Sequence, residues 1–259
     1  GSPLSYAITG LAADTKYDAY CVTQAGMLSN VATVATSGFK NDPAAKTGGY
    51  AAAQITVTFQ SHNTENVRCV AMADGASAPT GAAINAGNAG HQGTSPVAAS
   101  ATGGSDKDVV FTGLTAATAY DVYCATASNV VSAKHDCFAS GFSAQPAKAT
   151  DSAGTSITVS VTPTVSENVR CVAVTEGESA PTAAEVNAGQ KSGGGSPVSS
   201  SPATSGTAGF SLSVSIGSLT AASQLDVYCA TAAGVLGTKL DLYTSGFSAH
   251  PAKYGDTVR

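Results

Sequence analysis

One segment occurs three times in this chain, and its repetition limits the available folds more than any other feature. It reads LAADTKYDAYCVTQ at 11–24, LTAATAYDVYCATA at 114–127 and LTAASQLDVYCATA at 219–232. In the middle copy, every second side chain from Tyr120 to Thr126 points to the same side of an extended chain. The segment therefore predicts a β-strand with a fixed lead-in, and the chain contains three such strands.

Further segments recur in a constant order around this strand. The tripeptide Ser-Gly-Phe marks each copy, beginning at Ser37, Ser140 and Ser245. Between these marks, NVRCVA, SAPT, NAG (from Asn85 and from Asn187) and DVYCATA recur in the same order in two successive copies. This order predicts tandem copies of one domain. We expect complete copies at 42–144 and 145–250, a partial copy with only the last strands at 1–41, and at 251–259 the first strand of a further copy or a donor tail.

Each complete copy is predicted to consist of short strands separated by turns. In the first complete copy we expect strands near 46–51, 54–59, 66–73, 107–112, 119–127 and 130–139. A short helical turn is expected at 183–188, because Thr182 and Glu185 form a capping-box pattern and Gly189 follows where a helix would end. The same turn is expected at 81–86. The segments after these turns are rich in Gly, Ser and Pro, which predicts exposed loops.

The composition agrees with small all-β domains. Hydrophobic residues make up 43% of the chain, but much of this is Ala and Val, and Trp is absent. Charged residues make up only 11%, against about a quarter in an ordinary globular chain. We therefore expect small aliphatic cores and surfaces made of Ser, Thr, Gly and Ala.

The charge and hydropathy patterns exclude two classes of partner. The net charge is −5 and Lys and Arg do not cluster, so a nucleic-acid partner is not expected. No apolar run approaches the roughly 18–20 residues of a membrane span. No signal peptide opens the sequence, which we interpret as a mature piece or a fragment.

No group of residues predicts an enzyme or a cofactor site. No nucleophile, zinc-protease, phosphate-loop or paired-carboxylate motif occurs. A metal site is not expected, because there is no CxxC motif and the His residues fall at unrelated positions of the repeats. The acids Asp121 and Asp226 are interpreted as part of a solvated face. Calcium binding by Asp106 and Asp108 has little support, because Lys107 separates them.

The order of the repeated segments resembles a known family. PAKATDSAGTSITVSV, NVRCVAV and SVSIGSLTAASQLDVYCATA, in that order, are similar to a fibronectin type III domain, and the resemblance covers nearly the whole chain. The variant resembles cysteine-bearing repeats of algal and bacterial extracellular surface proteins. It implies an all-β fold of tandem antiparallel sandwiches, with a short helical turn between strands C and C'. Phe59 and Val161 stand where the family usually has a core Trp, and Leu225 replaces the Tyr kept at Tyr17 and Tyr120.

The resemblance also assigns four of the six cysteines. It makes NVRCVA strand C and DVYCATA strand F, which are neighbours in one sheet. Disulfides Cys69–Cys124 and Cys171–Cys229 are then implied; the alternative is buried free thiols that pack as small apolar side chains. Disulfides of this kind form in an oxidising compartment, so we expect an extracellular or cell-surface location.

Cys21 and Cys137 belong to no pair within a copy. Cys21 is the strand F cysteine of the partial copy, and Leu242 stands at the position of Cys137 in the next copy. An unpaired cysteine in an oxidising compartment suggests a bond to another segment or chain. The alternative is an isolated thiol at a domain junction.

The partial copy leads to a hypothesis about function. A half-sandwich has an unpaired sheet edge and an open core, which another polypeptide must complete. Completion by a further copy of the chain, head to tail, would produce an open filament. We therefore predict a structural subunit of an extracellular filament or surface appendage. The sequence also allows a window in a longer tandem array, and the alternative function is an adhesin or a carbohydrate-binding or spacer module of a larger secreted protein.

The Ser-, Thr- and Pro-rich loops have the composition of O-glycosylated stalks. Asn-x-Ser/Thr does not occur. Covalent glycans would keep a surface with few charges soluble, although flexible bare loops are the alternative. The candidate glycosylation residues are Thr94, Ser95, Ser196, Ser199, Ser200, Ser201 and Thr204.

Overall fold

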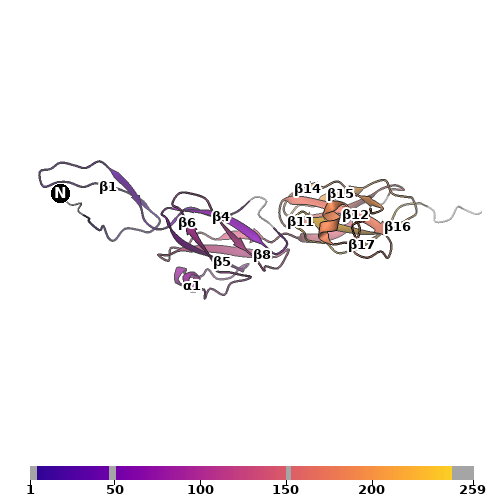
Figure 1. Cartoon of the computed structure of the whole chain (residues 1–259), viewed down its shortest axis with the longest axis horizontal. Coiled ribbons are helices and arrows are strands. Elements are labelled where there is room, and N and C mark those ends of the chain that lie inside the picture. Colours follow the sequence, from indigo (N-terminus) through magenta and orange to yellow (C-terminus); the bar gives the residue numbers. More distant parts are fainter. Residues whose placement is uncertain (1–4, 47–50, 150–152, 247–259) are drawn as a thin grey trace, which may run out of the picture. The chain divides into compact units, whose positions relative to one another are not determined.

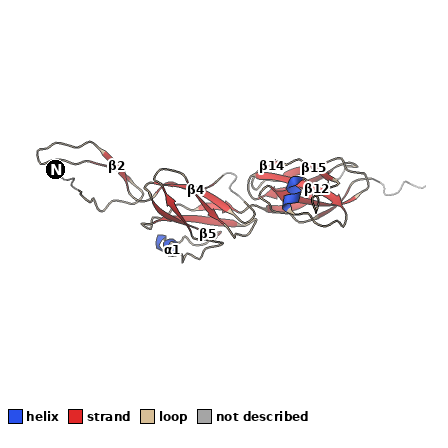
Figure 2. Cartoon of the chain, viewed as in Figure 1, coloured by secondary structure: helices blue, strands red, loops and turns tan. Residues whose placement is uncertain are grey.

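The computed structural model describes residues 5–46, 51–149 and 153–246. It divides into two compact units, Gly1–Ala139 and Ser140–Arg259. Almost all regular structure is β-strand, as Figures 1 and 2 show. The expected strand at 251–259 lies outside the described residues.

The first unit contains one complete β-sandwich. One sheet has the order β3-β4-β7 and the other has the order β6-β5-β8-β9, and all pairs are antiparallel. The strands are β3 (Phe39–Ala45), β4 (Ile55–Ser61), β5 (Glu65–Ala73), β6 (Val97–Ala101), β7 (Lys107–Phe111), β8 (Ala119–Thr126) and β9 (His135–Phe138).

The second unit repeats this architecture. Its sheets have the orders β10-β11-β15 and β13-β12-β16-β17, and β14 also pairs with β12. The strands are β10 (Phe142–Lys148), β11 (Ile157–Pro163), β12 (Glu167–Thr175), β13 (Ser199–Ser200), β14 (Thr204–Gly206), β15 (Leu212–Ile216), β16 (Gln224–Thr231) and β17 (Leu240–Tyr243).

These orders place strands A, B and E in one sheet and C', C, F and G in the other. The prediction of tandem antiparallel, fibronectin type III-like sandwiches is therefore confirmed. The short helices also lie where they were predicted, as α1 (Gly81–Ala86) and α2 (Ala183–Ala188) between strands C and C'. Thr182 and Glu185 form the capping box, and Gly189 ends α2 with φ of 72°, a conformation that favours glycine.

The central strands β5 and β8 of the four-stranded sheet in the first unit are buried on both faces. The inner face of this sheet packs against the three-stranded sheet, in a core that includes Phe59, Phe111 and Val122. Its outer face packs against the helix, where Ile84 contacts a cluster with Tyr123. This double burial explains why strand β8 is buried at nearly every residue and does not alternate.

Three features differ from the sequence-based expectation. The first strand of each sandwich begins at Phe39 and Phe142, before the expected boundaries at 42 and 145, because these two phenylalanines are buried in the cores that follow them. The strand expected at 46–51 is not found at residues 46 and 51, and its other residues, 47–50, lie outside the described part of the chain. The loop expected after α1 contains strand β6, which pairs with β5 from Cys69 to Glu65.

No described helix has the length and apolar character of a membrane span, since α1 and α2 have six residues each.

Candidate functional site

The partial copy folds as a β-hairpin. Strand β1 (Lys16–Ala19) pairs with β2 (Ala32–Ala35), with Lys16 opposite Ala35 and Ala19 opposite Ala32. Strands β8 and β9 have the same register, with Ala119 opposite Phe138. Equivalent residues differ by 103 in number, as Cys21 and Cys124 do. The hairpin, which we call the F–G hairpin (residues 5–36), therefore supplies strands F and G of a sandwich (Figure 1).

Local hydrogen bonds hold the F–G hairpin in the geometry of a complete sandwich. The Ala12 amide donates to the Tyr17 hydroxyl at 2.8 Å, and the Cys21 amide donates to Ser29 Oγ at 2.9 Å. The equivalent bonds to Tyr120 and Ser132 have the same lengths. The first is the tyrosine corner of immunoglobulin-like sandwiches. Both bonds are local in sequence and are made within the hairpin itself, while Asn63 of the first sandwich donates to the Ala35 carbonyl of β2 at 3.1 Å.

The F–G hairpin exposes apolar side chains whose equivalents are buried. Ile8 is 63% exposed, whereas its equivalent Phe111 is fully buried in the sandwich core. Apolar side chains are exposed on both faces of the hairpin, because neither an opposing sheet nor a helix covers it among the described residues. The exposed apolar side chains are Tyr6, Ile8, Leu11, Tyr20, Val22, Met27, Leu28, Val31 and Val34. An apolar surface of this kind marks an interaction site.

Cys21 lies in the most apolar part of this surface. It lines an open depression of about 560 Å³ together with Tyr6, Val22, Thr23, Met27, Leu28 and Ser29. Among the residues that the structure describes, Cys21 is exposed and forms no disulfide. Its equivalents do: Cys124 bonds to Cys69 and Cys229 bonds to Cys171. The two disulfides that the resemblance implied are therefore present.

Cys137 has a different environment from Cys21. Its side chain is 4% exposed within the first sandwich core, and its thiol donates to the Tyr120 carbonyl at 3.6 Å. Burial, with smaller contributions from Asp136 and Asp121, raises the pKa of Cys137 to about 12. A buried thiol that stays protonated does not react with another chain. The burial of Cys137 favours the isolated thiol, which was the alternative interpretation of this residue.

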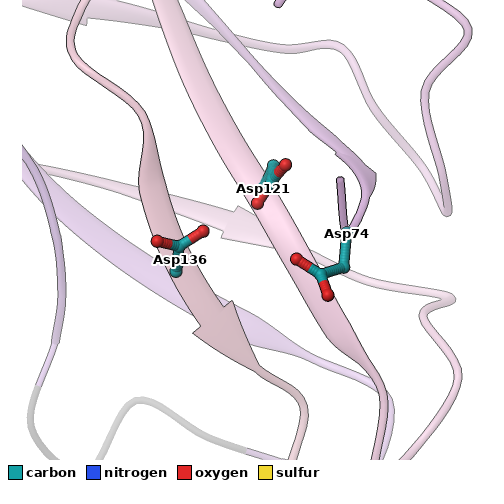
Figure 3. A group of neighbouring side chains, drawn as sticks. All are labelled: Asp74, Asp121 and Asp136. Atoms are coloured by element: carbon teal, nitrogen blue, oxygen red, sulfur yellow. The ribbon is translucent and has the colours of Figure 1, made fainter. Parts of the chain in front are cut away.

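Each sandwich brings three carboxylates together, which the sequence did not predict. In the first unit these are Asp74, Asp121 and Asp136, and their oxygens lie within 4.8 Å of one another (Figure 3). Asp121 is 1% exposed, so the interpretation of a solvated face is wrong for this residue and for the equally buried Asp226. The second unit has the equivalent group Glu176, Asp226 and Asp241.

A lysine occupies the centre of each carboxylate group. Lys134 Nζ lies 3.3 Å from Asp121 and 2.5 Å from Asp136, and Lys239 Nζ makes the same contacts in the second unit. The hydrogen bonds that Lys134 donates to Asp136 and Asp121 raise the pKa of Lys134 above its usual range. Burial opposes ionisation of Asp226, but bonds from Lys239 and the Gly177 amide outweigh it and lower its pKa. The spacing of the oxygens would suit a metal ion, but the ammonium group already supplies a positive charge there.

The pair Asp106 and Asp108 has separate partners. Asp108 accepts hydrogen bonds from Lys46 and Thr58, and Asp106 accepts one from Gln60. The bond from Lys46 lowers the pKa of Asp108. The two carboxylates therefore support cross-strand contacts on the three-stranded sheet, and they do not form a calcium site with each other.

The candidate glycosylation residues differ in accessibility. Ser95 is 6% exposed and donates to the Gln92 carbonyl, and Ser201 is 3% exposed and accepts from the Cys171 amide. Both hydroxyls are held inside the fold, so these two residues do not suit modification. Ser199 and Thr204 are half-buried and donate to backbone carbonyls. The exposed candidates are Thr94, Ser196 and Ser200.

Two residues that the sequence analysis did not single out connect strand C, the helix and strand F. Arg68 Nη1 donates to the Asn85 carbonyl at 2.7 Å, and Asn85 Nδ2 donates to the Thr126 carbonyl at 2.8 Å. Arg170 and Asn187 make the same bonds in the second unit. The exact recurrence of NVRCVA and NAG was the signal that could have identified them.

Comparisons with known proteins extend to fold alone. No family model and no curated protein matches this chain. Among solved structures, it is similar to the chicken CNTN1 FN1-FN3 domains, with 13% identity, a TM-score of 0.29, and coverage of 91% of this chain and 80% of that chain. It is also similar to the central Fibronectin-III array of RIM-binding protein, with 10% identity, a TM-score of 0.26, and coverage of 81% and 71%. At these scores the sandwich assignment stands on the strand order of the chain itself.

Proposed function

We propose that this chain is a structural subunit of an extracellular filament or surface appendage, in which a neighbouring subunit completes the F–G hairpin. One observation carries the proposal. The F–G hairpin has the register and local hydrogen bonds of strands F and G, yet it exposes the side chains that face the core and the helix in both complete sandwiches.

The exposed surface is large enough to drive association. Burying a large apolar side chain contributes about 1.5–3 kcal/mol. Ile8, Tyr20 and Leu28 are each more than half exposed. Because the hairpin is already ordered by its own hydrogen bonds, docking does not pay the full cost of ordering it.

The sequence supports a head-to-tail arrangement. A hairpin completed by a different part of a second copy makes a heterologous contact, which repeats without closing unless the rotation forms a ring. Residues 251–253 repeat the motif that ends strand A of the second sandwich, since PAK occurs at both 146–148 and 251–253. The two internal disulfides fit an oxidising extracellular location. Thr94, Ser196 and Ser200 are the residues at which we propose glycans.

Electron microscopy of the full chain at micromolar concentration tests the proposal. We expect regular filaments, which the substitution Leu28→Glu on the F–G hairpin abolishes. Phe210→Glu is the matched control, because Phe210 is equally exposed but lies in the second unit. Monodisperse monomers of the unmodified chain, with and without reductant, would exclude a filament subunit and leave an adhesin or spacer module.

A further inference from the structure

Strand F receives the same three connections in both complete sandwiches. The first is the disulfide from strand C, Cys69–Cys124 in the first unit. The second is the bond from the Ala127 amide to the Asn66 carbonyl, at 2.9 Å. The second unit repeats both, through Cys171–Cys229 and through Ala232 and Asn168 at 2.8 Å.

The third connection comes from the helix. Asn85 Nδ2 donates to the Thr126 carbonyl, and Asn187 Nδ2 donates to the Thr231 carbonyl, both at 2.8 Å. The helix asparagine follows the strand C cysteine at one constant distance, since 69 and 85 differ by the same number as 171 and 187. The segment that completes strand F therefore has a fixed pattern: Asn-x-x-Cys in a strand, followed by Asn in a short capped helix.

The F–G hairpin presents the group that strand F contributes to each of the three connections. The equivalents are the Cys21 thiol, the Gln24 amide and the Thr23 carbonyl. Cys21 is free and exposed, and within the described part of the chain no partner is found for the Gln24 amide. The Thr23 carbonyl accepts from the Gly26 amide at 2.9 Å, as Thr126 does from Asn129, so its second lone pair is available.

The free edge of β1 is the edge that strand C occupies in a sandwich. Strand β8 pairs with β5 on one side and with β9 on the other, whereas among the described strands β1 pairs only with β2. In the β5–β8 register, Cys69 lies directly opposite Cys124. A strand that adds to β1 in this register therefore brings its own cysteine opposite Cys21.

We propose that the F–G hairpin binds a strand–helix segment of a neighbouring subunit with the Asn-x-x-Cys pattern, and that Cys21 forms an intersubunit disulfide with the cysteine of that segment. Because Cys69 and Cys171 are already bonded within their own sandwiches, the partner is a further segment of this pattern and neither of these two. This inference rests on the proposed function and names the partner of the same surface. The exposed apolar side chains Tyr20, Val22 and Leu28 receive the helix, because their equivalents Tyr123, Ala125 and Val131 pack against α1.

The covalent step requires a small disulfide oxidant such as oxidised glutathione. Cys21 thiolate attacks the oxidant, whose sulfur–sulfur bond breaks, and one thiol leaves. The partner cysteine thiolate then attacks the Cys21 sulfur of the mixed disulfide, and the second thiol leaves. Two cysteine thiols are thereby oxidised to one disulfide, the oxidant is reduced to two thiols, and the cysteine protons pass to them.

A peptide that corresponds to residues 65–90 of this chain tests the inference, because it carries Asn66, Cys69 and Asn85 at the required spacing. The full chain is incubated with this peptide in a buffer of reduced and oxidised glutathione, and mass spectrometry measures the peptide–Cys21 disulfide. We expect it to form about tenfold faster than with a scrambled peptide that keeps the cysteine, because docking raises the effective concentration of the thiol. Asn85→Ala in the peptide should reduce this advantage, and Cys21→Ser in the chain should abolish the product.

Equal rates for the two peptides would overturn the inference. The native material gives a second measurement, since digestion without reduction should release Cys21 joined to a peptide of the Asn-x-x-Cys type. On a non-reducing gel the subunits should form a ladder, and a single monomer band would exclude an intersubunit bond. If the Cys21→Ser variant still forms filaments, and Cys21 is a free thiol in the unmodified chain, the disulfide is refuted and the proposed filament is not. Selective peptide coupling without filaments would refute the proposed function alone.

Discussion

Tyr20 and Tyr123 occupy the same position of the repeat, but Tyr20 is 57% exposed and Tyr123 is 5% exposed. Both lie three residues after the tyrosine of a Tyr-Asp pair, and both precede a cysteine. The difference arises from α1, whose Ile84 packs in one cluster with Tyr123 and with Met72 of β5. No such helix covers Tyr20 among the described residues. Within the described part of the chain, the F–G hairpin therefore lacks the helix that covers strand F in a complete sandwich.

The two tyrosines predict different effects of the same substitution. Tyr123→Ala should lower the free energy of unfolding of the first sandwich by about 3 kcal/mol, because it leaves a cavity under α1. Tyr20→Ala should change it by less than about 0.5 kcal/mol in the monomer, because the side chain is exposed. Urea denaturation at a concentration below assembly measures both. A large effect of Tyr20→Ala under those conditions would show that the hairpin packs against the monomer itself.

Removal of a disulfide should destabilise its own sandwich. The bridges Cys69–Cys124 and Cys171–Cys229 join residues 55 and 58 positions apart. In the chain-entropy account, loss of a cross-link of this length costs about 4 kcal/mol. We expect the double substitution to alanine in one sandwich to shift its urea midpoint downward and to leave that of the other unchanged. An equal shift in both would contradict independent sandwiches.

The first sandwich should lose stability as the solution becomes mildly acidic. The Ala45 amide donates to Nε2 of His135 at 2.8 Å, and burial, which outweighs the opposite effect of Asp136, lowers the pKa of His135. The folded state therefore binds fewer protons than the unfolded state, whose His titrates near 6.5. Its contribution to stability is complete above about pH 6.5 and is lost as the pH falls below that value.

The second sandwich supplies the control for this prediction, because Leu240 stands at the position of His135. Thermal denaturation between pH 7 and 5 should show a smaller loss of stability in His135→Leu than in the unmodified chain. The same pH dependence in both proteins would assign the effect to other groups.

The effects of substitutions at Gly81 and Asn129 on the free energy of unfolding should be coupled, because the two residues lie on neighbouring segments. A Cβ atom at Gly81 would overlap the backbone of Asn129, so Gly81→Ala should destabilise the first sandwich by about 1–2 kcal/mol despite the better helix propensity of alanine. The second sandwich has Ala183 at this position, facing Gly234. Asn129 has φ of 65° and Gly234 has φ of 91°. Asn129→Gly should therefore restore part of the stability lost in Gly81→Ala, and a double-mutant cycle in urea that shows simple additivity would contradict the coupling.

Removal of the lysine at the centre of the carboxylate group should destabilise the sandwich at neutral pH. Lys134→Met leaves Asp121 buried beside two other carboxylates with no positive charge. The hydrogen bond from Lys134 lowers the pKa of Asp136, so the contribution of this pair is present above about pH 3.9 and is lost as the pH falls through the lowered value. Urea midpoints at pH 7 and pH 3 should show a larger effect of Lys134→Met at pH 7. Lys239→Met in the second unit is the matched variant, and an effect that does not depend on pH would indicate a loss of packing only.

The sequence determined the features that depend on local chemistry and on repetition. The recurrence of DVYCATA and NVRCVA predicted tandem sandwiches, and their resemblance to fibronectin type III domains implied the two disulfides. Thr182, Glu185 and Gly189 predicted the ends of α2, because capping bonds are made within a few residues of each other. The composition predicted the largely aliphatic core of the second sandwich, but the core of the first also contains Phe39, Phe59, Phe111 and Tyr120.

Only the tertiary structure decided which repeated positions are covered. Strand β6 lies in a segment whose composition predicts a loop, because pairing with β5 overrides local preference. Cys137 and Asp121 are buried by strands distant in sequence, so neither the inert thiol nor the lysine-centred carboxylate group was visible in a local pattern. The different exposure of Tyr20 and Tyr123 has the same origin: two strands of similar sequence differ in whether a distant strand and helix pack on them.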